Sequence, residues 1–160
     1  MTLIQIRLGE EQFFGEYEEM ISTEVDIRVR YQETDQMGIV YHANYFTWFE
    51  AARIELLDRM DCPYRQLEKE GFLLPVLHCE AKFIKPANFD DRLKVRALIK
   101  EIPSARIRIN YEVFCAKVLL CTGITTHAFV DRDGKLKRPP EIFLKRARSN
   151  FTTLGALSDR

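Results

Sequence analysis

The sequence has little of what membrane-spanning, secreted or nucleic-acid-binding chains carry. No run of about 18 apolar residues occurs, so no segment is expected to cross a bilayer as a helix. The N-terminus lacks a basic stretch followed by an apolar one, so we expect no secretory signal. Lys plus Arg and Asp plus Glu number 24 each, which gives no general attraction to nucleic acid.

Cysteine is also scarce, and it shows no CxxC spacing of the kind found in metal or redox sites. The cysteines lie in or beside apolar runs, which favours buried free thiols and therefore a reducing, cytoplasmic compartment. His78 and His127 lie in strand patterns without a second ligand at i+2 or i+4, so we predict no metal site. The four cysteines are Cys62, Cys79, Cys115 and Cys121.

The length of 160 residues suits one domain, and no repeat or linker divides the chain. Residues 1–20 are rich in glutamate and are predicted to form an N-terminal extension. Residues 21–150 are predicted to form the single domain, and residues 151–160 a C-terminal tail.

One long helix is the strongest secondary-structure prediction. From Tyr45 to Met60 apolar residues recur at steps of three and four and leave only a narrow polar strip, so this helix should be mostly buried. Asn44 is a plausible N-cap for it. The stretch "YRQLEKEG" predicts a short second helix that ends at Gly71.

Strands are predicted on both sides of this helix in the sequence. Alternation of apolar and polar residues predicts a strand over residues 25–31. Four further strands are predicted after the helices, at residues 77–83, 93–99, 107–113 and 119–130. This order predicts an α+β fold in which one antiparallel sheet curls around one helix. The outer face of the sheet mixes polar and apolar residues, which favours a homo-oligomer.

The stretch "ETDQMGIVYHANYF", residues 33–46, carries the candidate chemistry. Asp35 and Gly38 suit a turn in which Asp35 bonds its own backbone and Gly38 adopts a positive φ. We expect the apolar residues 39–41 to tuck under the domain. From His42 onward, free amides at a helix N-terminus favour negative charge. A carboxylate opposite such donors is what hydrolysis of an ester or thioester requires.

The motif "YQETDQMGIVYHANYFTWFEAAR" closely resembles the signature of the 4-hydroxybenzoyl-CoA thioesterase-like and YbgC-like acyl-CoA thioesterases. The resemblance continues through "PYRQLEKEGFLLPVLHCEAKFIKPANFDDRL" and "HAFVDRDGKLKRPP". It implies the hotdog fold, a subunit pair with one continuous sheet, active sites at the dimer interface, and often a dimer of dimers. Gln36 and Ala43 replace prolines of the 4-hydroxybenzoyl branch, which places this chain nearer the general acyl-CoA branch.

The resemblance also assigns roles. Asp35 becomes the catalytic carboxylate, as nucleophile or as general base, and the His42 N–H becomes the donor to the thioester carbonyl. The His42 ring either assists or makes a hydrogen bond at the helix start. Lys137 and Arg138 are expected to meet the phosphates of coenzyme A, although a solvated loop is the usual meaning of such a segment.

Glu50 is the main rival to Asp35, because other hotdog thioesterases use a helix glutamate as the catalytic carboxylate. Its position on an apolar flank instead favours an ion pair with Arg53, one helical turn later. Tyr31 either lines the pocket or packs in the core. The full set of expected substrate-contacting residues is Tyr31, Gly38, Tyr41, Asn44, Glu50, Lys137 and Arg138.

The leading hypothesis is therefore an acyl-CoA thioesterase that needs no metal or redox cofactor and acts as a homodimer or homotetramer. One alternative is a hotdog acyl-thioester dehydratase that uses His42 with Glu50. Another is an acyl-CoA-binding hotdog protein without catalytic activity. The acyl chain and the choice between CoA and acyl carrier protein stay open.

Overall fold

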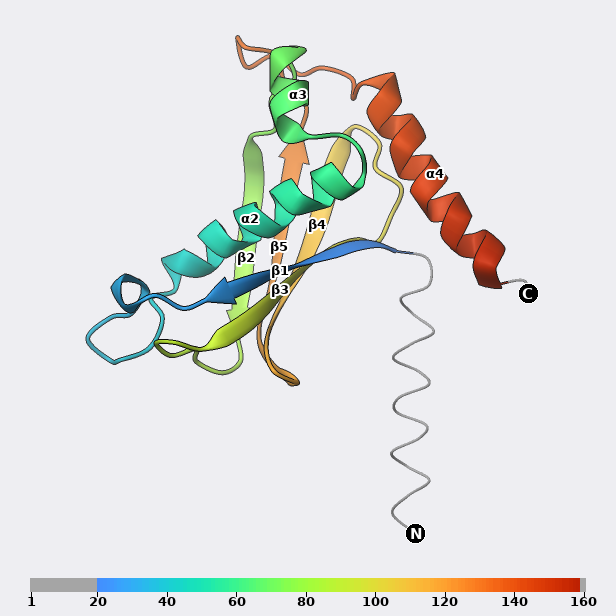
Figure 1. Cartoon of the computed structure of the whole chain (residues 1–160). Coiled ribbons are helices and arrows are strands. Elements are labelled where there is room, and N and C mark those ends of the chain that lie inside the picture. Colours follow the sequence, from blue (N-terminus) through green and yellow to red (C-terminus); the bar gives the residue numbers. More distant parts are fainter. Residues whose placement is uncertain (1–19, 159–160) are drawn as a thin grey trace.

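The computed structural model describes residues 20–158, which form one curled sheet with a helix across it (Figure 1). The strand order is β1-β3-β4-β5-β2, and every neighbouring pair is antiparallel. The strands are β1 (Ile21–Arg28), β2 (Val76–Phe83), β3 (Arg92–Ile99), β4 (Arg106–Cys115) and β5 (Val118–Ala128). The helices are η1 (Tyr31–Glu33, a 3₁₀ turn), α2 (Ala43–Arg59), α3 (Tyr64–Lys69) and α4 (Glu141–Ser158).

The core lies between α2 and the sheet, as the helical periodicity predicts. Phe49 is 1% exposed, and its ring stacks on that of Tyr111 from β4 at a centroid distance of 4.4 Å. Gly123 makes this packing possible, because a Cβ there would lie 2.3 Å from the Phe49 ring. A side chain at position 123 of β5 would therefore displace the Phe49 ring from its place against the sheet.

The predicted elements are confirmed, but two details at their ends were wrong. Asn44 is not the N-cap: α2 begins at Ala43, after His42, and the Asn44 side-chain amide donates to the Glu33 carbonyl oxygen at 2.8 Å. The preceding loop folds back on the helix and offers that acceptor. Tyr31 does not pack in the core, because β1 ends at Arg28 and the Tyr31 side chain is 78% exposed.

Strand β2 differs from the other four strands. Both β1 and β2 are edge strands, but β1 has buried residues, whereas the residues of β2 are exposed on both faces apart from half-buried Ala81. Val76, Leu77 and Phe83 are each about half exposed. An edge strand that presents apolar side chains and unpaired backbone groups is a template for pairing with another chain.

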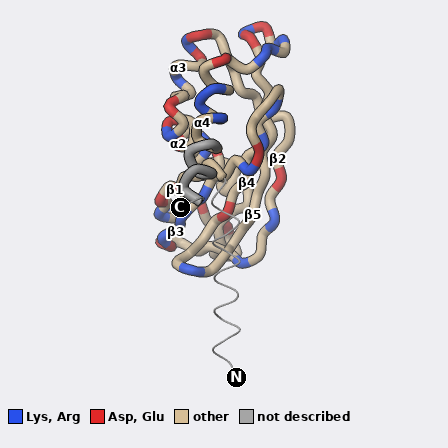
Figure 2. Tube along the Cα trace, turned by 90° about the vertical axis from the view of Figure 1, so that its right-hand side faces the viewer, with Lys and Arg blue, Asp and Glu red and all other residues tan. Residues whose placement is uncertain are grey.

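Helix α4 lies beside the sheet and buries Phe143 against Phe129, with ring centroids 5.1 Å apart. The domain boundary predicted at residue 150 falls inside α4. Apart from Met20, the predicted extension over residues 1–20 lies outside the described residues. None of the described helices is long and apolar enough to span a membrane. Figure 2 shows Lys and Arg interspersed with Asp and Glu over strands and loops.

Candidate active site

The loop between η1 and α2 folds into a narrow bend. The Asp35 N–H donates to the Ile39 carbonyl at 2.9 Å, and the Tyr41 N–H donates to the Glu33 carbonyl at 2.9 Å. At the tip Gly38 has φ +77°, which a side chain would oppose. The bend therefore holds Asp35 on one arm and leads the other arm directly into the N-terminus of α2.

Glu33 anchors this loop, although no pattern in the sequence singles it out. Its side chain is buried and accepts hydrogen bonds from the Arg30 N–H at 2.7 Å and the Trp48 indole N–H at 3.0 Å. Burial alone would raise the pKa of Glu33, but the hydrogen bonds from Arg30 and Trp48 outweigh it and hold the pKa below its ordinary value. The carboxylate is thus charged and ties the loop to α2.

Asp35 is half-buried, and one of its oxygens completes the turn. Oδ1 accepts a hydrogen bond from the Met37 N–H at 2.8 Å, which confirms the predicted turn role. Oδ2 accepts no hydrogen bond from any described residue. One hydrogen bond fixes the carboxylate while its second oxygen stays available, so the turn and a chemical role are compatible.

His42 lies at the N-terminus of α2 with an exposed side chain. Within residues 20–158 nothing accepts a hydrogen bond from its N–H, so this donor and the positive end of the helix dipole face outward. Its ring lies 4.3 Å from that of Tyr41 and 6.5 Å from that of Phe83, at the end of β2. The donor therefore lies beside an aromatic wall and next to the open edge of the sheet.

The prediction that residues 39–41 all tuck under the domain was wrong for Tyr41. Val40 is buried, but Tyr41 is about half exposed and contacts His42 instead. Its place beside the free amide leaves it available to contact a substrate.

The predicted Glu50–Arg53 ion pair was also wrong. No ion pair joins them: the Arg53 guanidinium lies over the Tyr64 ring at 5.4 Å, and Glu50 is exposed. Both side chains instead line a cavity of about 360 Å³ between α2 and strands β2, β4 and β5. The backbone turn at Pro63 brings Tyr64 under Arg53, and the helical spacing of the pair does not reveal that contact.

The two histidines in strands lack metal-site surroundings. The buried His127 bonds the Leu74 carbonyl through Nδ1 and the Thr125 hydroxyl through Nε2. Because Nδ1 faces a carbonyl, it carries the proton, and burial followed by the charge of Arg53 lowers the pKa of His127 to about 4. Within the described residues, no three His, Cys, Asp or Glu side chains form a group that could hold a metal.

Lys137 and Arg138 lie far from Asp35 along the domain. The Lys137 ammonium donates to the Gly71 carbonyl at 3.1 Å and lies 3.7 Å above the Phe72 ring, past the C-terminal end of α2. The 17-residue α2 is about 25 Å long, and Asp35 precedes its other end. Arg138 is exposed beside an apolar cavity of about 550 Å³. Contacts of these residues with coenzyme A stay a prediction.

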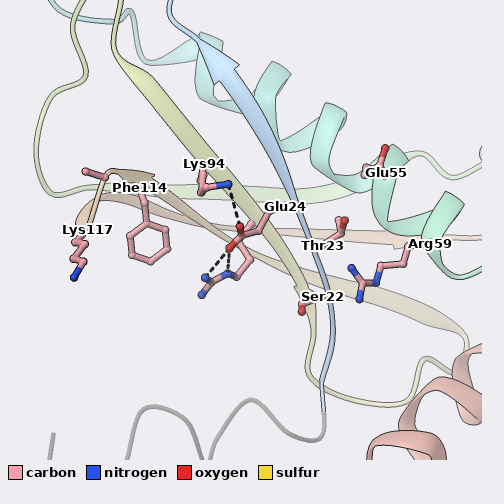
Figure 3. Close-up of a pocket in the computed structure, with 10 residues that line it drawn as sticks. Ser22, Thr23, Glu24, Glu55, Arg59, Lys94, Phe114 and Lys117 are labelled. Carbon is pink, nitrogen blue, oxygen red and sulfur yellow. Dashed lines mark hydrogen bonds and ion pairs between the residues drawn. The ribbon is translucent and has the colours of Figure 1, made fainter. Parts of the chain in front are cut away.

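A larger cavity, about 870 Å³, lies elsewhere, and several of the charges that line it are already paired (Figure 3). Glu24 on β1 accepts from Arg96 at 2.7 Å and pairs with Lys94 at 3.6 Å. The α2 residues that border this cavity are Glu55 and Arg59, near the C-terminal end of the helix. This open groove on β1 and β3 is therefore separate from the loop that bears Asp35.

A curled antiparallel sheet around one long helix defines the hotdog class of α+β proteins, and in this chain a carboxylate-bearing bend lies at the helix N-terminus. The model of the thioesterase-like superfamily matches residues 29–147, and the chain belongs to this superfamily.

Three relatives are similar over most of their length. The putative acyl-CoA thioesterase YneP of Bacillus subtilis is 35% identical over 110 residues, which cover 68% of this chain and 80% of the relative. The acyl-CoA thioesterase YbgC of Haemophilus influenzae is 32% identical over 126 residues, covering 78% and 90%. The crystal structure of the DHNA-CoA thioesterase from Staphylococcus aureus aligns with a TM-score of 0.76 at 29% identity, covering 86% and 93%. Membership places the chain among thioester hydrolases.

Proposed function

We propose that this chain is an acyl-CoA thioesterase that uses the loop of residues 33–42 to hydrolyse an acyl-CoA to a carboxylic acid and free CoA. One observation carries the proposal: the bend presents a free oxygen of Asp35 and a free N–H of His42 on its two arms. The relatives named acyl-CoA thioesterases support acyl-CoA as the substrate class.

In the proposed mechanism the His42 N–H and the dipole of α2 stabilise the negative charge that develops on the thioester carbonyl oxygen. Asp35 either attacks the carbonyl carbon or removes a proton from an attacking water. The carbon–sulfur bond then breaks, and the CoA thiolate leaves and takes up a proton. Where Asp35 is the nucleophile, this leaves an anhydride between the acyl group and Asp35, which water then hydrolyses to release the carboxylic acid and restore the carboxylate. Because a carboxylate, an amide and water supply every step, the proposal needs no metal or redox cofactor.

We propose that the working unit is a homodimer, or a dimer of such dimers, in which the two β2 strands pair. Strand β2 is an exposed edge with apolar side chains on both faces. Phe83 at its end also lies beside the His42 ring, so pairing through β2 would place the Asp35 loop at the interface. A cytoplasmic location is part of the proposal and is supported by the four free cysteines, although the prediction that all of them are buried was wrong: Cys79 is exposed and Cys115 half-buried.

The test is release of free thiol across a panel of acyl-CoAs by the wild type, D35N and D131N. Asn can keep the bond from the Met37 amide, so D35N should fold. Its rate of thiol release should fall on the order of 10²- to 10⁴-fold, as expected when an acid–base or nucleophilic group is lost. Asp131 is a matched control, because its Oδ1 accepts from two backbone amides in a distant turn. D131N should hydrolyse as the wild type does.

Two further variants separate the role of the His42 backbone N–H from that of its ring. Its φ of −54° suits proline, so H42P removes the N–H with little change of this angle, while H42A removes only the ring. The rate of thiol release should fall on the order of 10²-fold or more in H42P, and by less in H42A.

The rival carboxylate is tested with E50Q. If E50Q abolished hydrolysis while D35N kept it, the assignment of Asp35 would be wrong. Tight acyl-CoA binding by the wild type without release of thiol would support the acyl-CoA-binding alternative instead.

A further inference from the structure

Arg53 is a buried cation whose charge has no anionic partner in the described chain. Its residue is 7% exposed, and Nη1 has no hydrogen-bond partner. Among the described residues, the contact that offsets its charge is the Tyr64 ring, 5.4 Å away. Burying a charged group costs several kcal/mol unless a counter-charge or hydrogen bonds compensate it. The guanidinium therefore needs an anion from outside the described residues of its own chain.

The cavity beside Arg53 contains two kinds of polar group. His127, Thr125 and Tyr111 satisfy one another, since the Tyr111 hydroxyl bonds Thr125 at 2.9 Å and Thr125 bonds His127 at 2.9 Å. Glu50 also lines the cavity, is exposed, and makes no ion pair or hydrogen bond in the described chain. The two charged groups of the cavity without an ion-pair partner in the described chain are thus Arg53 and Glu50, a helical turn apart.

The charges of Arg53 and Glu50 both act on the Tyr111 hydroxyl in this cavity. Burial raises the pKa of Tyr111 to about 12, while the Arg53 charge lowers this pKa and the Glu50 charge raises it. The cavity is therefore lined by one buried cation and one exposed anion that form no ion pair within one subunit. An anionic acyl group beside Arg53 would leave Glu50 uncompensated and repelled, whereas a self-complementary contact would satisfy both.

The cavity is bordered by the edge strand that is open to a second copy. Val76 and Cys79 of β2 line the cavity together with Phe46 of α2. These β2 residues are exposed and belong to the strand whose outer edge is unpaired. In a two-fold dimer every contact occurs twice, so a residue that reaches a neighbour's cavity also has its own cavity filled.

We propose that Glu50 of a second copy of this chain enters the cavity and pairs with Arg53, and that the reciprocal pair forms on the other side of the two-fold axis. This inference rests on the dimer named under Proposed function and adds the residues that close it. Glu50 is then a positioning residue for the interface and leaves the chemistry to Asp35.

The test is charge reversal followed by mixing. E50R and R53E each place like charges at both contacts, so each variant alone should raise the dimer dissociation constant on the order of 10²-fold or more. An equimolar mixture restores opposite charges at both contacts and should form the heterodimer. The double variant E50R/R53E should also recover the dimer. Mass is measured by analytical ultracentrifugation, independently of hydrolysis, so failure of this inference differs from failure of the thioesterase proposal.

Neutral substitutions guard against a reversal that does not fold. E50Q and R53M should weaken the dimer to a similar degree, and E50Q/R53M should be no weaker than either single variant, because both remove the same contact. Additive effects, or a mixture of E50R and R53E that stays monomeric, would overturn the proposal. If R53M left the dimer intact but lost binding of an acyl-CoA with a terminal carboxylate, the anion would be the acyl group instead.

Discussion

Buried His127 should make the fold lose stability as the pH falls from 7 to 5. The pKa of this histidine is about 4 in the folded chain against 6.5 ordinarily, so the unfolded chain binds more protons between these values. A histidine held neutral by the fold contributes stability that is present above pH 6.5 and is lost as the pH falls toward 4. The full difference corresponds to about 3 kcal/mol. About 2 kcal/mol of it should disappear between pH 7 and pH 5.

The assay is urea unfolding followed through the fluorescence of Trp48, the one tryptophan of the chain, at a fixed protomer concentration. H127Q keeps an amide that can bond Thr125 or the Leu74 carbonyl and does not titrate, so its stability should change about 2 kcal/mol less between the two pH values. H78Q is the matched control, since the His78 side chain is 58% exposed. If H127Q lost as much stability as the wild type between pH 7 and pH 5, the reasoning would be refuted.

Three further predictions concern the packing and the loop. G123A should destabilise the fold by roughly 1–3 kcal/mol through overpacking against Phe49, and F49L should relieve part of that cost in a double-mutant cycle of urea unfolding; additive effects would contradict the clash. E33Q should cost about 2 kcal/mol, because it weakens charge-assisted hydrogen bonds from Arg30 and the indole; an unchanged urea midpoint would argue against this anchor. G38A and G134A both place alanine at positive φ and should each cost about 1 kcal/mol, but only G38A should slow thiol release.

The strands and the central helix were predictable because their burial follows a local period. In β4 buried and less buried residues alternate through Ile107, Ile109 and Tyr111, as an antiparallel strand with one covered face requires. In α2 the apolar steps of three and four match the buried side. These patterns depend on neighbours in sequence and need no knowledge of the rest of the fold.

The turn at Asp35 was predictable for the same local reason, but the surroundings of the loop were not. Asn44 has the chemistry of an N-cap, and only the return of the loop gives it the better acceptor at Glu33. Glu33 is buried through Trp48, 15 positions later, and no local pattern reveals this contact.

The cavity at Arg53 depends even more on tertiary structure. Its walls come from α2, β2, β4 and β5, so its existence follows from strand order and register. A helical wheel places Glu50 near Arg53 but does not show that Tyr64 holds the guanidinium on the other side. The sequence therefore indicates the two charged residues, but only the tertiary structure shows that they form no ion pair.

The anchoring of the loop at its base has a consequence for how this chain could diversify. Side-chain hydrogen bonds at Glu33 and Asn44 anchor the base of the loop, while the exposed tip is held by backbone bonds around Asp35 and by the bond from the Met37 amide to the Asp35 carboxylate. The side chains of Gln36 and Met37 are exposed, and that bond uses backbone of Met37 alone. Substitutions at these two positions can accumulate with little effect on stability. They can therefore change the substrate contacts of the tip while the base of the loop is preserved.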